Sequence, residues 1–479
     1  MLMSLQLIYG PSGSGKSYTL YKKIIEQSIR EPDREFIVIV PEQFTMQTQR
    51  ELVELHPNRG ILNIDVQSFL RLAWRIFEEV GVDTHTVLED TGKNLLLRRV
   101  ASRQKNDLTV LGRNFRKPGY ISQVKSIISE LKQYDVSLEE LDEQLRSGKK
   151  DALSYKLQDI RNLYEGFQEE LQGKYITSEE ILEELCYVVK KSEILKGCVV
   201  ALDGFTGFTP IQNKLLRELM QTAEKIYVTV TLDAWEDPMK KVSMHKLSYL
   251  SKKTIQQLAG AAKECGCMLE KPEVLGKEGS IRFRSAPALR FLERHLFRPG
   301  NQIYEAQDSQ KLERELSLHV ARDAKAEAEF AARTIWHLVR EENLRYRDIA
   351  VITGDMESFG DHMKKELQQK GIPCFIDRTR KLLLNPLVEF LRAALQIAAK
   401  SFRYESMFRY LRTGLAGLKK DEIDRLENYV LANGINSRRR WEEPWDEQEE
   451  PFKEKILPPL LAFVDQVREK DGTVRQKTE

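Results

Sequence analysis

Hydrophobic positions follow two different periods along the chain, and residues 1–95 alternate between them. A mainly apolar segment at residues 5–9 and a continuous apolar run at residues 36–40 predict short strands buried in a parallel sheet, and a third strand is expected within residues 60–66. Between the first two runs, residues 18–29 carry apolar side chains at helical spacing, which predicts an amphipathic helix. The order of these elements indicates an α/β domain with a parallel sheet.

The helical period then dominates residues 96–185, where few strands are visible. The strand pattern returns at residues 198–203 and 226–230, with a predicted helix between them. Residues 96–185 are therefore interpreted as a helical insertion into one α/β domain.

A second α/β pattern begins after a polar linker at residues 299–311, with helices between its predicted strands. These strands are expected at residues 316–320, 349–352 and 374–376. Residues 401–479 are helical and then charged, with nothing that resembles a domain closing on itself. We therefore expect the chain to stop part-way through a larger protein.

Composition narrows the class of protein but not its chemistry. The 479 residues are 41% hydrophobic and 31% charged, typical of a multidomain globular protein, and no apolar run approaches the ~20 residues of a membrane span. The first predicted strand leaves no room for a signal peptide, so a cytoplasmic location without membrane contact is expected. The net charge of +2 does not by itself imply nucleic acid, and the five cysteines form no metal-binding pattern.

The turn between the first predicted strand and helix fits G-x-x-x-x-G-K-[ST], the phosphate-binding loop. Its glycines let consecutive backbone N–H groups point at phosphate oxygens, and the helix N-terminus adds partial positive charge. In such a loop the lysine reaches the β- and γ-phosphates and the final hydroxyl can ligate Mg²⁺. The candidate ATP-binding residues are Gly10, Pro11, Ser12, Gly13, Ser14, Gly15, Lys16 and Ser17.

A second nucleotide motif lies at the end of the strand at residues 198–203. Asp203 follows an apolar run and is the candidate partner of Ser17 in holding Mg²⁺, although an aspartate that only ends a strand is the structural alternative. In ATPases with brisk turnover a glutamate follows this aspartate, whereas here the next residue is Gly204. Glu193 and Glu236 could replace that general base only if the fold brings them close.

Arg284 lies before an amphipathic helix at the end of the first α/β domain. An arginine at this place could neutralise charge on a γ-phosphate, and a solvated or ion-paired arginine fits the sequence equally well. No confident catalytic residue is predicted.

The order of the motifs along this chain resembles the order found in one protein family. The phosphate-binding loop is followed by residues 40–43 (Val-Pro-Glu-Gln), residues 68–74, residues 202–212 (beginning Leu-Asp-Gly-Phe-Thr-Gly-Phe) and Arg284-Ser285. The combination closely resembles the AddB (RexB) family, whose members are one of the two subunits of bacterial ATP-dependent helicase–nucleases and share the architecture of UvrD-type superfamily-one helicases.

The resemblance implies a P-loop NTPase fold of RecA-like parallel-sheet domains with large helical insertions. Residues 1–95 and 186–298 would form the first RecA-like domain, and 96–185 its insertion. Residues 299–311 would be the linker, 312–400 the start of the second RecA-like domain, and 401–479 the start of that domain's insertion. The family continues into a nuclease domain with an iron–sulfur cluster, which is absent here, and none of the five cysteines matches its ligands.

The resemblance also implies a function. Such a protein pairs with an AddA-like helicase–nuclease and processes DNA double-strand breaks for recombinational repair, so enzymatic activity belongs to the complex. ATP and Mg²⁺ would bind this chain, while Gly204 agrees with a degenerate motor that holds the nucleotide. Three alternatives remain open: an active ATP-driven helicase, a P-loop small-molecule kinase, and a scaffold in which the loop is empty.

Single-stranded DNA, including a recognition sequence called Chi, would meet the loops that follow the strands. An arginine for phosphates and a tryptophan for stacking is the pairing expected of a single-strand platform, and amide or hydroxyl side chains can bond base edges. Spacing alone favours core packing for the tryptophan. The candidate DNA-binding residues are Gln43, Thr45, Arg71, Trp74, Phe205 and Phe208.

Overall fold

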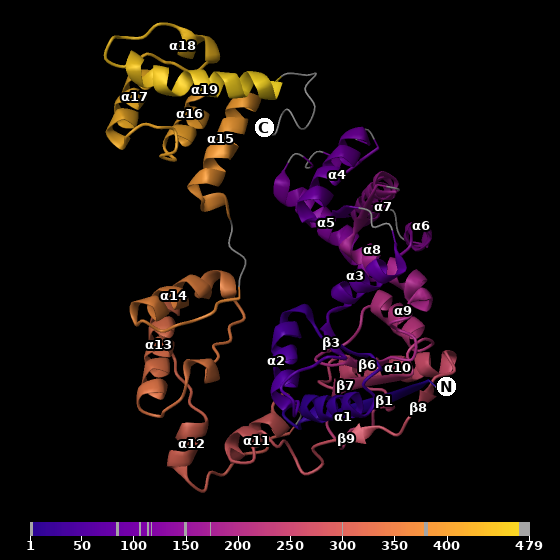
Figure 1. Cartoon of the computed structure of the whole chain (residues 1–479). Helices are drawn as coiled ribbons and strands as arrows, with labels where there is room; N and C mark the ends of the chain where they lie inside the picture. The colour runs from indigo at the N-terminus through magenta and orange to yellow at the C-terminus, as the bar shows by residue number, and fades with distance from the viewer. Residues whose placement is uncertain are drawn as a thin grey trace. The chain divides into compact units, whose positions relative to one another are not determined.

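The computed structural model describes residues 3–82, 86–104, 107–112, 115, 117–147, 151–172, 174–298, 300–377 and 382–468. The chain divides into two compact units, Met1–Leu318 and His319–Glu479. Figure 1 shows the chain coloured from its N-terminus to its C-terminus. Each unit is described by itself below.

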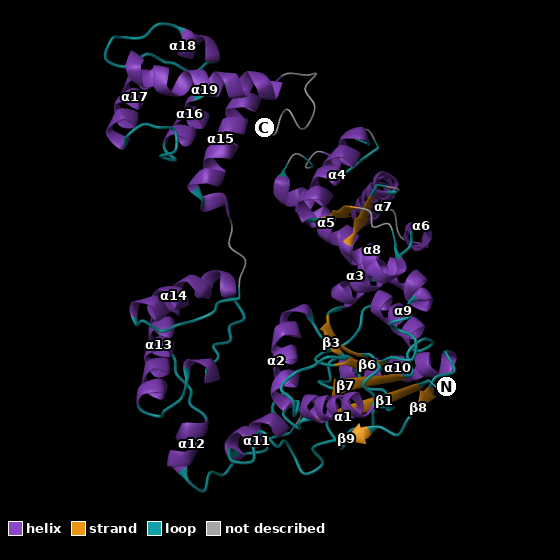
Figure 2. Ribbon diagram, viewed as in Figure 1, coloured by secondary structure: helices purple, strands orange, loops and turns teal. Residues whose placement is uncertain are grey.

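A parallel sheet forms the centre of the first unit, and Figure 2 shows its strands in orange. The strand order is β3-β2-β6-β7-β1-β8, and β9 also pairs with β1. The strands are β1 (Ser4–Gly10), β2 (Phe36–Ile39), β3 (Ile64–Gln67), β6 (Val199–Leu202), β7 (Lys225–Thr231), β8 (Met268–Leu269) and β9 (Glu273–Val274). Every pairing in this sheet is parallel. The predicted α/β fold class with a parallel sheet is confirmed.

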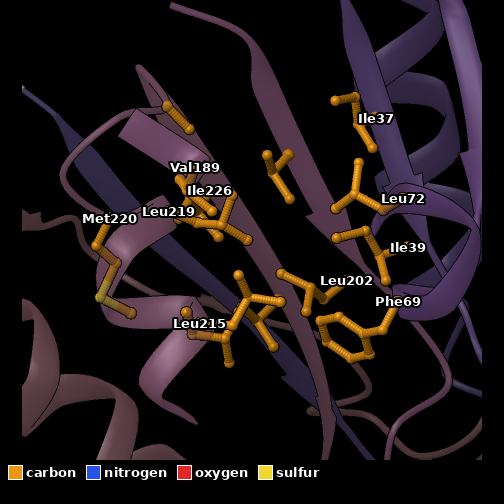
Figure 3. Close-up of a cluster of buried hydrophobic side chains, with 14 of the residues drawn as sticks. Ile37, Ile39, Phe69, Leu72, Val189, Leu202, Leu215, Leu219, Met220 and Ile226 are labelled. Carbon is orange, nitrogen blue, oxygen red and sulfur yellow. The ribbon is translucent and has the colours of Figure 1, made fainter. Parts of the chain in front are cut away.

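Successive residues of a strand point to opposite faces, so each face of the sheet has its own hydrophobic cluster. Phe36 and Val38 of β2 pack with residues of α1 (Lys16–Arg30) and α2 (Thr45–Leu55). Ile37 and Ile39 join the opposite cluster, which includes side chains of α3 (Phe69–Val80), α8 (Ser178–Val188), α9 (Pro210–Leu219) and α10 (Tyr249–Glu264). Figure 3 shows this second cluster, with Phe69 and Leu72 of α3 beside Ile37 and Ile39. The two layers of helices fix the sheet and therefore the loops at its edges.

The segment between β3 and β6 is mainly helical and has a hydrophobic cluster of its own. It contains a small parallel sheet in which β4 pairs with β5. Besides α3, its described elements are β4 (Thr86–Leu88), α4 (Asp90–Arg103), α5 (Pro118–Gln133), α6 (Leu138–Ser147), α7 (Ala152–Leu171), β5 (Tyr175–Thr177), α8 and η3 (Val189–Lys191). Three further helices of the first unit are η1 (Glu42–Phe44), α11 (Pro287–His295) and α12 (Ser309–Glu315). The domain boundaries expected from the sequence stay predictions.

The second unit contains two hydrophobic clusters, one between α13 and α14 and one among α15 to α19. Its helices are α13 (Ala324–Arg340), η4 (Tyr346–Asp348), α14 (Met356–Gln369), η5 (Leu382–Leu384), α15 (Pro386–Lys400), α16 (Tyr404–Leu411), α17 (Lys420–Ala432), α18 (Arg438–Glu442) and α19 (Glu450–Arg468). Among the described residues of this unit no segment is a strand, as the helices and loops in Figure 2 illustrate.

The strands expected at residues 316–320, 349–352 and 374–376 are therefore wrong for this structure. These apolar segments leave large side chains in solvent: Leu318, Ile352 and Phe375 are each at least 90% exposed. An extended segment becomes a strand only when a neighbour takes up its backbone N–H and C=O groups, and sequence composition does not supply that neighbour. The helices α13 and α14 pack against each other around Ala328, Ala332 and Met363.

Neither a membrane-spanning helix nor a metal-binding cluster occurs among the described residues. None of the helices in the described ranges is long and apolar enough to span a bilayer. The same ranges hold no group of three or more His, Cys, Asp or Glu side chains that could bind a metal ion. All five cysteines are free thiols.

Candidate functional site

The predicted phosphate-binding loop leads from β1 directly into α1. Gly13 and Gly15 have φ angles of 74° and 88°, in the left-handed region that favours glycine. A Cβ atom on Gly13 would lie 2.6 Å from the Ser280 Oγ and 2.7 Å from the Arg282 Cβ, so a larger residue would clash. The tight turn and the close approach of residues 280–282 account for glycine at this position.

Lys16, the first residue of α1, folds back over the loop. Its Nζ donates to the carbonyl oxygens of Gly10 at 3.1 Å and Pro11 at 2.9 Å. Burial lowers the pKa of Lys16 below its usual value, and the charge of Asp203 partly opposes this shift. Among the described residues the ammonium group bonds only these two loop carbonyls, so it is placed to exchange them for an anion.

Asp203 follows β6 and is buried, with 5% of its surface exposed. Its backbone N–H donates to the Ile39 carbonyl at 3.1 Å, which extends the pairing of β6 with β2 by one bond. The Tyr21 hydroxyl donates to Asp203 Oδ2 at 2.7 Å, and the Thr229 hydroxyl donates to Oδ1. Side chains from α1 and β7 thus converge on the carboxylate at the end of β6, and its part in holding Mg²⁺ stays a prediction.

Gly204 occupies the position at which an active ATPase would carry its glutamate. Its φ angle is 79°, and a Cβ atom here would point at the Pro41 Cδ, 3.5 Å away, and the Phe44 Cδ2, 3.9 Å away. The backbone at this position therefore directs a side chain toward η1.

The other acids considered as a general base are engaged elsewhere. Glu193 ion-pairs with Lys196 in the turn before β6, at the amino edge of the parallel sheet, whereas Asp203 lies at the carboxyl edge. Glu236 ion-pairs with the buried Lys252. The side chain of Arg284 is exposed, and its predicted phosphate contact stays a prediction.

Two charged residues near the loop were missed at the level of sequence. Arg282 and Glu293 both act electrostatically on Lys16, Arg282 lowering and Glu293 raising its pKa. Burial raises the pKa of Glu293 itself, and the charge of Asp233 adds to this effect. No motif marks either residue, because α11 and the segment before it meet the loop only through the fold.

The six candidate DNA-binding residues follow three neighbouring strands at the same edge of the sheet. Gln43 and Thr45 come after β2, Arg71 and Trp74 after β3, and Phe205 and Phe208 after β6. Local sequence explains where the helices begin: Ser68 caps α3 by accepting the Arg71 N–H at 3.3 Å, and Thr209 forms a capping box at α9. The carboxyl ends of parallel strands bring these loops together.

The surroundings of the individual candidates differ. Gln43 is exposed, whereas Thr45 is buried and its hydroxyl donates to the Glu42 carbonyl at 3.1 Å. Direct contact between DNA and the Thr45 hydroxyl would therefore require this turn to open. The rings of Phe205 and Phe208 lie 5.2 Å apart and pack on Phe69, leaving both partly buried.

Arg71 and Trp74 have different neighbours although they are three residues apart on α3. The Arg71 guanidinium is 3.2 Å from the Glu42 carboxylate in an exposed ion pair. Trp74 is partly buried, meets Phe77 edge-on at 5.9 Å, and lines a hollow of about 690 Å³. The same hollow is lined by Glu165, Glu169, Glu180, Glu183 and Glu184. Their carboxylates disfavour phosphate groups there, so a base rather than a phosphate would have to meet this tryptophan.

Comparison with known proteins assigns the family. Residues 7–293 match the family model described as ADDB, N-terminal, which covers more than half of the chain. The chain belongs to the AddB family. Residues 284–456 also match the model of the UvrD-like helicase C-terminal domain.

Relatives within the AddB family are similar over nearly the whole chain. The chain is 46% identical over 449 residues to the B-type subunit of the ATP-dependent helicase/deoxyribonuclease of Lachnoclostridium phytofermentans, covering 93% of this chain and 38% of that relative. It is 35% identical over 476 residues to the protein of the same name from Clostridium novyi, covering 98% and 41%. The chain thus spans about two fifths of the length of these relatives. All of the predicted nucleotide-binding and DNA-binding residues lie within the AddB match.

Proposed function

We propose that this chain is the nucleotide-binding and single-strand-binding part of the AddB-type member of a bacterial ATP-dependent helicase–nuclease. One observation carries the proposal. The phosphate-binding loop, Asp203 and the six candidate DNA-binding residues all follow the carboxyl ends of strands, at one edge of the sheet. The names of the relatives support the ATP-dependent activity and the existence of a companion protein in the complex. That companion is an AddA-like helicase–nuclease, and the assembly processes DNA ends in the cytoplasm for double-strand-break repair.

The loop residues fit the phosphates of ATP. Lys16 would exchange the Gly10 and Pro11 carbonyls for phosphate oxygens, the loop N–H groups would bind further oxygens, and Ser17 with Asp203 would hold Mg²⁺. The metal would supply charge neutralisation at the phosphates. An iron–sulfur cluster belongs to the nuclease domain expected in the rest of the protein.

Because burial lowers the pKa of Lys16 in the free protein, ATP binding should take up a proton in alkaline solution. The phosphates favour the charged ammonium, so affinity is full below the lowered pKa and falls, by at most about tenfold per pH unit, as pH rises above it. Calorimetric titration with ATP at pH 10.5, the ordinary pKa of a lysine, in two buffers of different ionisation enthalpy measures this uptake. Equal enthalpies in both buffers would contradict the protonation assigned to Lys16.

Nucleotide holding, rather than rapid turnover, is supported by the surroundings of Asp203. Gly204 supplies no carboxylate, and Glu193 and Glu236 are engaged in ion pairs. An active helicase would need another base, and no observation at the site favours a small-molecule kinase. We therefore propose that ATP binding orders the loops that meet single-stranded DNA and contributes to recognition of the Chi sequence.

The test is a comparison of wild type with Gly204→Glu in ATP binding and in steady-state ATPase assays with saturating single-stranded DNA. Wild type should bind ATP with negligible turnover. The added glutamate should not create turnover, because the Cβ direction points at Pro41 and Phe44, and its left-handed backbone should cost about 1–2 kcal/mol of stability.

Gly204→Ala is the matched control, since it introduces the same backbone strain without a carboxylate. DNA-stimulated hydrolysis by wild type would favour the active helicase. Hydrolysis by Gly204→Glu alone would show that a complete motor lacks only its base.

A further inference from the structure

A buried chain of hydroxyl groups leads away from Asp203 into the helices on one face of the sheet. Tyr21 of α1 is 3% exposed, and its hydroxyl lies 2.7 Å from Asp203 Oδ2 and 3.4 Å from the Thr48 Oγ1 of α2. Thr48 is also buried. The phosphate-binding motif does not include Tyr21 or Thr48, and neither has a role in the function proposed above.

The direction of these hydrogen bonds follows from charge. Burial and the neighbouring Asp203 carboxylate raise the pKa of Tyr21, so its hydroxyl keeps its proton. That single proton is donated to the carboxylate, which is the stronger acceptor. The Thr48 hydroxyl therefore donates to the Tyr21 oxygen, and both bonds depend on the charge at Asp203.

The far end of this chain lies close to the predicted DNA loop. Thr48 is one helical turn from Thr45, the first residue of α2, and Gln43 lies in η1 immediately before it. The Thr45 hydroxyl is bonded to the Glu42 carbonyl, and the Glu42 carboxylate pairs with Arg71. A shift of the first turn of α2 would therefore move several candidate DNA contacts together.

We propose that Tyr21 is a positioning residue that couples nucleotide binding at Asp203 to the DNA-facing start of α2. The inference rests on the function proposed above. A nucleotide-bound metal held by Asp203 would draw on the charge of the carboxylate and weaken its bond to the Tyr21 hydroxyl, and the bond between Tyr21 and Thr48 would change with it. Linkage makes the effect reciprocal, so single-stranded DNA should change nucleotide affinity by the same factor.

The experiment is a set of fluorescence-anisotropy titrations of a labelled single strand with the 479-residue chain, without nucleotide and with saturating Mg²⁺ and a non-hydrolysable ATP analogue. Couplings between sites are typically about 5–150-fold, and we expect the wild-type ratio of the two affinities to be at least about fivefold. Tyr21→Phe keeps the ring in the core and removes only the hydroxyl, and should bring the ratio close to one.

Two further threonine variants separate positioning from simple structural support. Thr48→Val breaks the link to α2 without touching Asp203, so it should reduce the ratio and leave nucleotide affinity unchanged. Thr229→Val removes the other hydroxyl on Asp203 but leaves the Asp203–Tyr21–Thr48 bonds in place, so it should change nucleotide affinity and preserve the ratio. Thermal melts establish that each variant is folded.

The outcomes distinguish the two proposals. Wild type that binds neither ligand overturns the proposed function and this inference with it. Wild type that binds both ligands without coupling, or with a coupling that survives Tyr21→Phe and Thr48→Val, overturns the inference alone.

Discussion

Lys16→Ala should weaken ATP binding by about 100-fold or more. The ammonium now makes two hydrogen bonds, to Gly10 and Pro11, and its replacement removes the donor that phosphate oxygens would take over. Hydrogen bonds to charged groups contribute about 1.5–3 kcal/mol each, and about 2.7 kcal/mol corresponds to 100-fold in affinity. Equilibrium titration with fluorescent ATP measures the difference.

Lys22→Ala is the matched control, since Lys22 is exposed on the same helix and contacts only the Tyr18 ring among the described interactions. Its affinity for ATP should equal that of wild type. If Lys16→Ala also binds like wild type, the loop does not hold a triphosphate and the scaffold alternative is favoured.

The second large effect is expected for Arg71→Ala combined with Trp74→Ala, which should reduce single-strand affinity by about 30–100-fold. Base stacking on an aromatic ring contributes about 1–3 kcal/mol, and the loss of one phosphate contact adds to it. Titrations of a labelled oligonucleotide at several salt concentrations also separate the two residues. Arg71→Ala alone should reduce the slope of log affinity against log salt by about 0.7, the value for one phosphate contact on a single strand.

Stability has to be checked together with affinity. The exposed Arg71–Glu42 pair contributes at most about 1 kcal/mol, whereas Trp74 packs against Phe77 and its loss will lower the melting temperature. Arg50→Ala is the control for the loss of an exposed ion pair, since Arg50 forms a similar pair with Glu54 on α2. Its single-strand affinity should equal that of wild type. Unchanged binding by a folded double variant would remove these residues from the DNA site.

The sequence predicts the first unit well because its signals are local. A buried strand, the G-x-x-x-x-G-K-[ST] turn and a helix follow one another within about 30 residues, and each has a strong pattern. The motif after β6 is equally local. The phosphate-binding loop and the loop after β6 therefore follow the strands that the sequence predicts. The sequence does not show which side chains pack around these loops.

The failures concern contacts between residues that are distant in the sequence. In the sequence, Tyr21 is indistinguishable from the other buried-face residues of an amphipathic helix. Its hydrogen bond joins it to Asp203, which is 182 positions away. The strands expected in the second unit have the right composition, but pairing depends on a neighbour that composition does not reveal. The ion pair between Glu236 and Lys252 is likewise not visible in the sequence, whereas Glu193 pairs with Lys196 only three residues away.

The order of strands has a consequence for synthesis on the ribosome. β2 can pair early with β3, but Ser4 of β1 pairs with Lys225, so the first strand to be translated waits for a partner made much later. At about 5–20 residues per second this delay is roughly 10–40 s. Throughout that time the N-terminal strand has two open edges, whereas the helices between β3 and β6 already have a cluster of their own to collapse upon. We therefore expect nascent chains of this protein to need protection of β1, and the phosphate-binding loop to be among the last parts of the first unit to take its final form.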